Sequence, residues 1–514
     1  MTSILTNTAS MVALQTLKGI NNNLNSLQNE ISTGKSISSA KDNSAVWAIS
    51  KVMESDVKGF EGISDSLALG ESTVAVARNA AETVTDLLTE MKGKIVAAQE
   101  ENVDREKIQT DIQALTNQIK SVVGAAQFNG LNLVTGTEDV NVLASLDRSS
   151  DGTVKASDIS VSRQDLTTTA GVYGTGDTAI AANITASASA IDSTGAANQL
   201  ELTIAGAGTD DLTLTINGKS LTIAHNADRD AMMLDAAGQI NALGMTGITA
   251  DEDAGGTGQL NIINTNAFET FNVSWNSGGT NTIAAVNNGD TTQNVSAATG
   301  SNSNILEQRA EEVVLDKNAA VNDGDSYRIS VNGNDFNYIA GKGETMEDVA
   351  KGLKSAIDAG NETGVATKVT QNDAGEWVVM VDYDGSDTTA GATMTLSENG
   401  QAGGTASGGL FGLDNIDVTT DSGADAALDN IETLIQNSID AAAEFGSSQS
   451  RIEIQSDFIG RLSDSLKAGI GTMVDADMEE ASAKLQALQV QQQLGIQSLS
   501  IANQSPQSVL SLFR

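Results

Sequence analysis

The sequence predicts an α+β protein, in which long helices from both chain ends pack together and a β-rich segment is inserted between them. Apolar residues near both ends recur at the three- and four-residue spacing of helical seams. The middle instead contains alternating apolar runs around Asn-Gly turns, as strands do. Charge also separates the parts: residues 143–424 carry 12 basic and 38 acidic side chains, a net charge of −26, in a chain whose total is −39.

The first helix is predicted from five apolar residues that alternate three and four positions apart, as in the seam of a coiled coil. Gly34 follows this stretch and is a suitable helix C-cap. The seam residues are Leu17, Ile20, Leu24, Leu27 and Ile31.

Two further helices follow in the N-terminal part. One keeps its apolar register from Ile63 to Ile95, and the other runs from Ile108 to Ala126 and ends at the turn signal Asn129-Gly130. The apolar residues that we expect to pack in this bundle are Val74, Leu88, Met91, Ile112, Leu115 and Ile119.

The C-terminal end repeats the pattern. One apolar stripe runs from Leu428 to Met473 and includes Leu462 and Leu466, and a last stripe begins at Val474. The predicted seam residues of this last helix are Met478, Leu485, Leu488, Leu499 and Leu510. Such seams cannot be buried alone, so we expect the two ends to pack on one another and the outermost helices to need a neighbouring chain. An ordinary bundle within one chain remains an alternative.

The middle is predicted to contain two copies of a β-β-α-β-β module, at about residues 198–265 and 325–397. Each copy begins with a hairpin, around Asn217-Gly218 and Asn332-Gly333. A short amphipathic helix and a second strand pair follow in each, and Thr345 with Asp348 forms a capping box for the second helix. Residues 179–196 and 276–304 are interpreted as loops or weak strands.

Composition excludes much catalytic chemistry. The chain has no Cys and a single His, His225, so it offers no thiolate nucleophile, no Cys-ligated metal and no site with two His ligands. Its acidity opposes binding to nucleic acid, whose affinity comes from Lys and Arg. No phosphate-binding loop, nucleophile elbow or metalloprotease motif occurs. We therefore expect no enzyme, no cofactor and no metal.

The segment from Asp147 to Asp158 spaces some of its acids like a Ca²⁺-binding loop. Positions that normally hold oxygen ligands are occupied by Ser and Lys, and the flanking residues look like strands. A hairpin turn is the preferred interpretation. The start of the chain lacks the features of a cleaved signal peptide, and no run of about 18 apolar residues predicts a membrane span.

Both ends resemble bacterial flagellins. At the N-terminal end the resemblance rests on residues 27–34, 39–45 and 127–130; at the C-terminal end it rests on Asp475-Ala-Asp-Met478, on Gln489-Val490 and on residues 502–514. The opening residues and Trp47 are most similar to alphaproteobacterial members. The two central modules resemble the flagellin hook IN motif, chiefly at Ile216-Asn217 and Val331-Asn332.

The resemblance implies a structural subunit that assembles itself into the flagellar filament, outside the cell, after unfolded export through a flagellar type III apparatus. It implies a filament core from residues 1–42 with 475–514, a tube wall from 43–175 with 405–474, and an outer acidic part at 176–404. The implied partners are further copies of the chain, the cap, junction proteins and an export chaperone. A hook–filament junction protein is the alternative.

Two departures from the family pattern affect the expected contacts. Val46-Trp47 replaces smaller residues, so Trp47 is expected to pack in the tube wall, between subunits or within one. Some members carry an Arg/Leu-rich patch that a Toll-type innate immune receptor binds, whereas residues 90–95 here read Glu-Met-Lys-Gly-Lys-Ile. We therefore expect weak or no activation of that receptor.

Overall fold

The computed structural model describes residues 7–149, 153–176, 179–194, 198–252, 257–288, 293–387, 389 and 391–511. The chain divides into two compact units. The first comprises Met1–Ser72, Val140–Val161 and Ser447–Arg514, and the second comprises Thr73–Asp139 and Ser162–Gly446. Helices and strands occur in both, so the predicted α+β class is confirmed.

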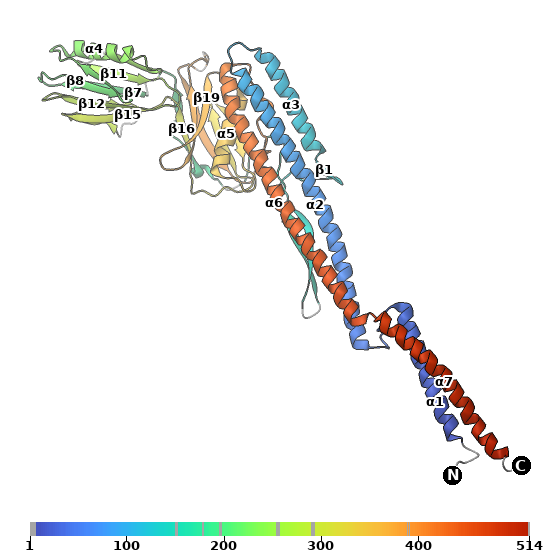
Figure 1. Cartoon of the computed structure of the whole chain (residues 1–514). Coiled ribbons are helices and arrows are strands. Elements are labelled where there is room, and N and C mark those ends of the chain that lie inside the picture. Colours follow the sequence, from blue (N-terminus) through green and yellow to red (C-terminus); the bar gives the residue numbers. More distant parts are fainter. Residues whose placement is uncertain are drawn as a thin grey trace. The chain divides into compact units, whose positions relative to one another are not determined.

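The first unit contains the paired ends of the chain. Helix α1 spans Thr8–Thr33 and α7 spans Met478–Ser511. They lie side by side, and the first residues of α1 and the last residues of α7 lie at the same end of the pair (Figure 1). The unit also holds the first part of α2, Ser44–Ala98, and the last part of α6, Asp421–Val474.

Helices α1 and α6 end beside each other, and backbone hydrogen bonds join the two ends. Gly34 adopts the left-handed conformation, with φ of 69°, that ends a helix, as its position predicted. The N–H of Ser36 donates to the carbonyl of Val474 at 2.7 Å, and the N–H of Ala476 donates to the carbonyl of Gly34 at 3.0 Å. Lys35 and Asp475 thereby form an isolated antiparallel bridge.

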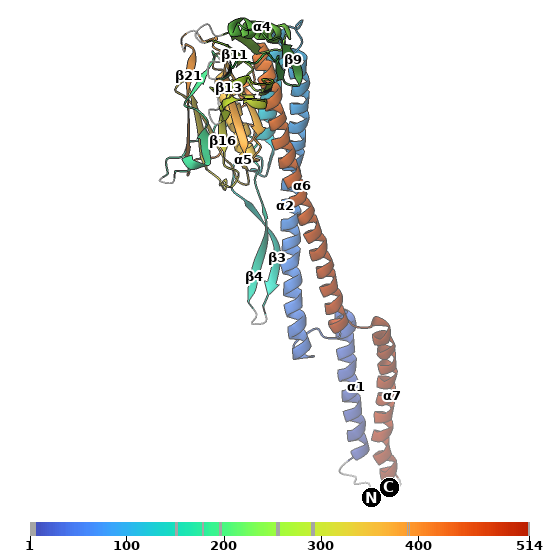
Figure 2. The same cartoon turned by 90° about the vertical axis from the view of Figure 1, so that its left-hand side faces the viewer.

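A β-hairpin lies against α2 in the first unit, as Figure 2 shows. Its strands are β3, Val140–Arg148, and β4, Val154–Val161. The amide of Gln455 in α6 donates to the carbonyl of Ala144, 2.9 Å away. The strands flanking the calcium-like segment confirm the hairpin interpretation, while residues 150–152 of its turn lie outside the described residues.

The second unit begins as a bundle made of the remainder of α2, helix α3, Arg105–Ala125, and the first part of α6. Asp104 caps α3 by accepting a hydrogen bond from the N–H of Lys107. After α3 the chain makes a tight antiparallel pair, β1 at Gln127–Phe128 and β2 at Leu131–Asn132, around the predicted Asn129-Gly130 turn.

The first β-rich body, called here the first sandwich, contains nine strands and one helix, α4, at Arg229–Ala242, among its described residues. One sheet has the order β10-β11-β7-β13-β14, and the other has the order β15-β12-β8-β9. Their bounds are β7 Gln199–Ala205, β8 Leu212–Ile216, β9 Lys219–Ile223, β10 Ile248–Glu252, β11 Gln259–Asn264, β12 Phe271–Asn276, β13 Thr282–Asn287, β14 Val295–Ala298 and β15 Ser301–Leu306. Apolar residues of both sheets and of α4 form one buried core.

The second sandwich consists of two four-stranded sheets and helix α5, Met346–Gly360. The sheet orders are β19-β20-β16-β5 and β18-β17-β21-β6. Their bounds are β5 Ile184–Ala186, β6 Ala190–Asp192, β16 Glu311–Leu315, β17 Ser326–Val331, β18 Asn334–Ile339, β19 Val365–Gln371, β20 Trp377–Tyr383 and β21 Thr393–Gln401. Short 3-10 helices lie at Ala181–Asn183 and Leu413–Asn415.

The hairpin, helix and strand pair expected in each repeat are present. Asn217 and Asn332 have φ of 47° and 52°, and each is followed by a glycine with positive φ, as a tight Asn-Gly hairpin turn requires. The predicted capping box of Thr345 and Asp348 is formed. The Asn-Gly signals therefore located the two hairpin turns correctly, and the capping box located the start of α5 correctly.

Each sandwich is larger than the repeat predicted within it, because it also includes strands from the neighbouring segments. Residues 276–304, expected to be loops or weak strands, hold β13, β14 and β15 of the first sandwich. Residues 179–196 supply β5 and β6 to the second. Short polar strands such as Ser301–Leu306 have few apolar residues and are recognised only through the core that they help to cover. The three-part division of the whole chain stays a prediction.

Candidate assembly interface

The seam between α1 and α7 is where most of the predicted assembly residues lie. The helices run antiparallel: the amide of Asn7 donates to the carbonyl of Ala502, and the amide of Gln492 donates to the side-chain oxygen of Asn21. Side chains that are partly or fully buried recur every three or four residues on both helices. They include Leu17, Ile20, Leu24, Leu27, Ile31, Leu485, Leu488 and Leu499.

The two helices approach closely at a glycine. A side chain at Gly495 of α7 would lie 3.2 Å from Leu17 and 3.8 Å from Ile20, both on α1. Leu27 is 7 % exposed, but the other seven of these seam residues are only half-buried. A two-helix seam covers one side of each leucine, and the remaining apolar area stays available to a further helix.

The same helices carry a second set of apolar side chains, which no described residue covers. On α1 these are Met11, Val12 and Leu14, each more than half exposed. On α7 they are Val490, Leu494, Ile496 and Ile501, with exposed fractions of 54 to 69 %. A run of exposed apolar residues on paired helices is typical of a protein–protein contact surface. The predicted seam did not include these residues, because they lie off its spacing.

Two predicted seam residues lie elsewhere. Met478 begins α7 and is 43 % exposed, next to the break between α6 and α7. Leu510 lies in the last turn of α7, where the side chains fall outside the described residues.

The predicted wall residues fall in both units. In the second unit six of them form the apolar interior of the bundle: Val74, Leu88, Met91, Ile112, Leu115 and Ile119, none more than 9 % exposed. In the first unit Trp47, Leu462 and Leu466 are half-buried. Ile454 and Phe458 of α6 are 69 and 55 % exposed and were not predicted. The helices of the first unit therefore also present uncovered apolar side chains.

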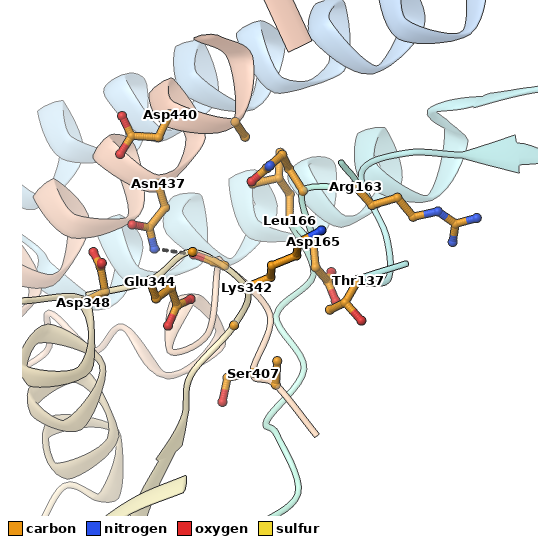
Figure 3. A pocket seen from close by; sticks show the side chains of 16 residues that line it. Thr137, Arg163, Asp165, Leu166, Lys342, Glu344, Asp348, Ser407, Asn437 and Asp440 are labelled. Carbon is orange, nitrogen blue, oxygen red and sulfur yellow. Dashed lines mark hydrogen bonds between the residues drawn. The ribbon is translucent and has the colours of Figure 1, made fainter. Parts of the chain in front are cut away.

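A cavity of about 200 Å³ lies in the second unit, where α6 meets the loop before α5 and the segment after β4. Asn437 and Asp440 of α6, Lys342 and Glu344 of the loop, and Asp165 line it, and the Arg163 guanidinium points away from Glu344 (Figure 3). Lys342 pairs with Asp139 at 2.7 Å.

Burial raises the pKa of Glu344 to about 7, although the Tyr338 hydroxyl donates a hydrogen bond to it at 3.0 Å. This carboxyl therefore exchanges its proton near neutral pH. Among the described residues no three His, Asp or Glu side chains gather as they would around a metal ion, and no described helix is long and apolar enough to cross a membrane.

Known families match both ends of the chain. The bacterial flagellin N-terminal helical region matches residues 4–139, and the bacterial flagellin C-terminal helical region matches residues 428–513. Flagellin A of Rhizobium meliloti is 30 % identical over 520 residues, which cover the whole of both chains. The chain belongs to the bacterial flagellin family.

Other relatives agree with this assignment. Flagellin D of Rhizobium meliloti is 29 % identical over 521 residues, again the full length of both chains. Flagellin FljK of Caulobacter vibrioides is 40 % identical over 171 residues, which make up 32 % of this chain and 62 % of the relative. The predicted similarity to alphaproteobacterial members is confirmed.

This flagellin is a structural subunit of the bacterial flagellar filament. A solved structure of flagellar hook associated protein-3 from Legionella pneumophila is similar over 82 % of this chain and 98 % of its own, with 10 % identity and a TM-score of 0.30. A likeness at that level carries no argument for the junction alternative, and the full-length relatives favour the filament subunit.

Proposed function

We propose that the subunit polymerises through the uncovered apolar residues of α1 and α7, which we call the outer helical face: Met11, Val12, Leu14, Val490, Leu494, Ile496 and Ile501. The observation that carries the proposal is the contrast between the two sides of this helix pair. The seam side is partly buried within the chain, whereas the outer side is exposed. Burying apolar area yields about 25 cal/mol per Å², so neighbouring chains gain stability by covering it.

The contacts that follow are between different surfaces of successive subunits. A contact of that kind repeats without closing and generates an open helix. The half-buried seam residues, from Leu17 to Ile31 and from Leu485 to Leu499, then become fully buried when further helices pack around each pair. In this proposal residues 1–42 with 475–514 line the filament core, and residues 43–175 with 405–474 form its wall.

Exposed wall residues supply further contacts. Trp47, Leu462 and Leu466 are half-buried, and Ile454 and Phe458 of α6 are exposed, so neighbouring wall helices can cover them. Residues 176–404, which hold the acidic modules, then decorate the outside. Their charge opposes adhesion between filaments.

The outer helical face is tested by exchanging two of its residues for polar ones of similar size. Val12→Gln with Leu494→Gln should leave the helical content of the monomer unchanged, because both side chains are exposed, and should strongly reduce polymer yield after sedimentation. Leu234→Gln on α4, where Leu234 is 62 % exposed, is the matched control and should polymerise normally. Normal filaments from the double variant would contradict the proposal.

The remaining partners follow from family membership. We infer export through a flagellar type III apparatus without a cleaved signal peptide, with an export chaperone, junction proteins and a cap as partners. A structural role without catalysis, cofactor or nucleic-acid partner completes the proposal. Secretion in a strain that lacks the flagellar export gate would contradict the export route.

Receptor activation is proposed to be weak. Glu90 and Gly93 are exposed on α2, and the two neighbouring cations are already paired, Lys92 with Glu432 and Lys94 with Asp111. This stretch therefore offers little free positive charge to a receptor that binds an Arg/Leu-rich patch. A cell reporter assay with purified monomer should give a low response, and full potency would overturn the inference.

A further inference from the structure

Lys354 of helix α5 is a buried cation at the contact between α5 and α6. Its side chain is 5 % exposed, whereas that of Lys351, one turn earlier on the same helix, is 29 % exposed. A lysine is almost never buried this far unless its ammonium group has partners. The ammonium group of Lys354 therefore depends on the polar groups that lie around it within the protein.

Three hydrogen bonds join Lys354 to Asp358 and Asn430 in a closed ring. The Nζ donates to Oδ2 of Asp358 at 2.8 Å and to Oδ1 of Asn430, on α6, at 3.0 Å. The Nδ2 of Asn430 donates to the same Oδ2 of Asp358, also at 3.0 Å. Thr367 of β19 donates to the other carboxylate oxygen, Oδ1, and so orients the carboxylate. One oxygen of Asp358 therefore contacts both the amine nitrogen of Lys354 and the amide nitrogen of Asn430.

The ring contains the three groups that an amide exchange requires. A lysine amine is a nucleophile once it has lost a proton, and an adjacent carboxylate is a base that removes the proton. The carboxamide carbon of Asn430 is the electrophile, and the hydrogen bond from Nζ to Oδ1 draws electrons away from that carbon. Because the folded chain holds all three groups at hydrogen-bonding distance, the reaction needs no encounter by diffusion.

We propose that Lys354 and Asn430 react to form an isopeptide bond, which links α5 covalently to α6. Oδ2 of Asp358 takes one proton from Nζ, and the neutral amine attacks Cγ of Asn430. Asp358 then gives its proton to Nδ2 and takes a second proton from Nζ, while the Cγ–Nδ2 bond breaks. The products are the Nζ–Cγ amide, one molecule of ammonia and a protonated Asp358.

The reaction balances without any other reactant. One C–N bond forms, another breaks, and nothing is oxidised or reduced. Of the three Nζ hydrogens, one stays on the new amide, one leaves in the ammonia and one remains on Asp358. The buried ion pair becomes a set of neutral groups, which removes the cost of burying two charges. A cavity of about 40 Å³ borders Asp358 and Asn430 and has room for ammonia, a molecule about as large as water.

The bond closes part of the chain into a loop, because Lys354 and Asn430 lie 76 positions apart. The loop contains strands β19, β20 and β21 of the second sandwich. A cross-link of this kind reduces the conformational entropy of the unfolded chain and so stabilises the folded one. Since the three reacting groups meet only in the folded chain, the bond forms after folding and does not depend on polymerisation.

Intact mass spectrometry of the purified full chain tests the proposal. The measured mass should be lower than the sequence mass by the mass of one ammonia molecule. Digestion with a Glu-specific protease should then give one branched peptide made of residues 348–362 and 399–432, which are not adjacent in the sequence. A chain without mass loss would overturn the proposal. So would an ammonia loss within a linear peptide, as cyclisation at an Asn-Gly turn gives, or a water loss, as a bond from Lys354 to Asp358 or Asp429 gives.

Two variants separate the reaction from a structural ion pair. Asn430→Ala removes the electrophile but leaves Lys354 paired with Asp358; it should show its full sequence mass and a lower midpoint of thermal unfolding. Asp358→Asn accepts no proton and should also lose no ammonia. Lys351→Arg, which keeps the pair with Glu347, is the matched control and should retain the branched peptide. An ammonia loss that persists in Asp358→Asn would contradict the mechanism. The unchanged chain decides whether the bond exists, even if a variant fails to fold.

Discussion

Arg309 and Asp382 form a bidentate ion pair. Arg309 lies in the segment that leaves the first sandwich, and Asp382 lies on strand β20 of the second. The Arg Nε lies 2.8 Å from Oδ1 and the Nη2 lies 2.7 Å from Oδ2. Both side chains are buried, at 13 and 3 % exposed. Beside them Ala310, Val378 and Met380 form a small apolar cluster with Phe268. The chain is thus fixed to the second sandwich where it leaves the first.

Arg309→Ala should destabilise the second sandwich by about 3–5 kcal/mol, because it leaves the Asp382 carboxylate buried without its partner. Hydrogen exchange of the β20 amides measures this loss locally. Arg461→Ala, which removes a cation that is 85 % exposed and 3.7 Å from Asp457, should change stability by less than about 1 kcal/mol. Equal protection of β20 in the two variants would contradict the assignment.

The stability of the second sandwich should fall as pH rises from about 4.5 to about 7, because Glu344 has a folded-state pKa of about 7 and an ordinary value of 4.5. Below the ordinary value both folded and unfolded forms hold the proton and no penalty exists. Above the raised value the buried carboxylate costs about 3 kcal/mol.

Glu344→Gln should remove that pH dependence and raise stability at pH 8, as followed by denaturant unfolding of the region that contains α5. Glu347→Gln, on the outer side of α5 where Glu347 pairs with Lys351, is the matched control. If the stability of Glu344→Gln still fell with rising pH as in the unchanged chain, another group would control the titration.

Replacement by alanine should have opposite effects on stability at two glycines of α2. A Cβ at Gly70 would lie 2.6 Å from Cγ1 of Val142, so Gly70→Ala should push the β3–β4 hairpin away and destabilise the first unit by about 1–3 kcal/mol. A Cβ at Gly93 meets nothing within 4 Å, so Gly93→Ala should stabilise α2 by up to about 1 kcal/mol. Thermal unfolding followed by circular dichroism measures both, and a stabilised Gly70→Ala would refute the close packing.

Removal of residues 485–514 should abolish filament formation and leave both sandwiches folded, because the deleted segment supplies half of the α1–α7 seam and none of the residues in the two sandwich cores. Electron microscopy checks for filaments, and hydrogen exchange of β8 and β17 checks the fold. Filaments of normal length from the truncated chain would rule out the terminal seam as an assembly element.

The sequence predicted the helices well, because their apolar spacing is long and regular. The positions of Leu17 to Ile31 and of Leu485 to Leu499 could be read as seams without the structure. The exposed residues Leu14 and Leu494 could not, since a helical pattern shows which face is apolar but not how much of that face the partner helix covers. The apolar residues that stay exposed, and are therefore available to other chains, could be identified only from the packing of α1 against α7.

The β-rich middle was predicted in part, for a different reason. The Asn217-Gly218 and Asn332-Gly333 hairpins carry a local turn signal, and both were found. Strands β14 and β15 are short and polar. Strand β14 pairs with the strand before it, at Ile283, whereas β15 passes over β13 and β14 in the sequence to pair with Val273 of β12.

The hydrogen bonds between Gly34 and Ala476 and between Ser36 and Val474 also affect the alignment of the two chain ends. A heptad seam of leucines tolerates a slip of one repeat, since each knob finds an equivalent hole. These backbone bonds allow only one alignment, because a slip of seven residues would break both and the bridge of Lys35 with Asp475. The break between α6 and α7 therefore sets the register of α1 against α7 within each subunit.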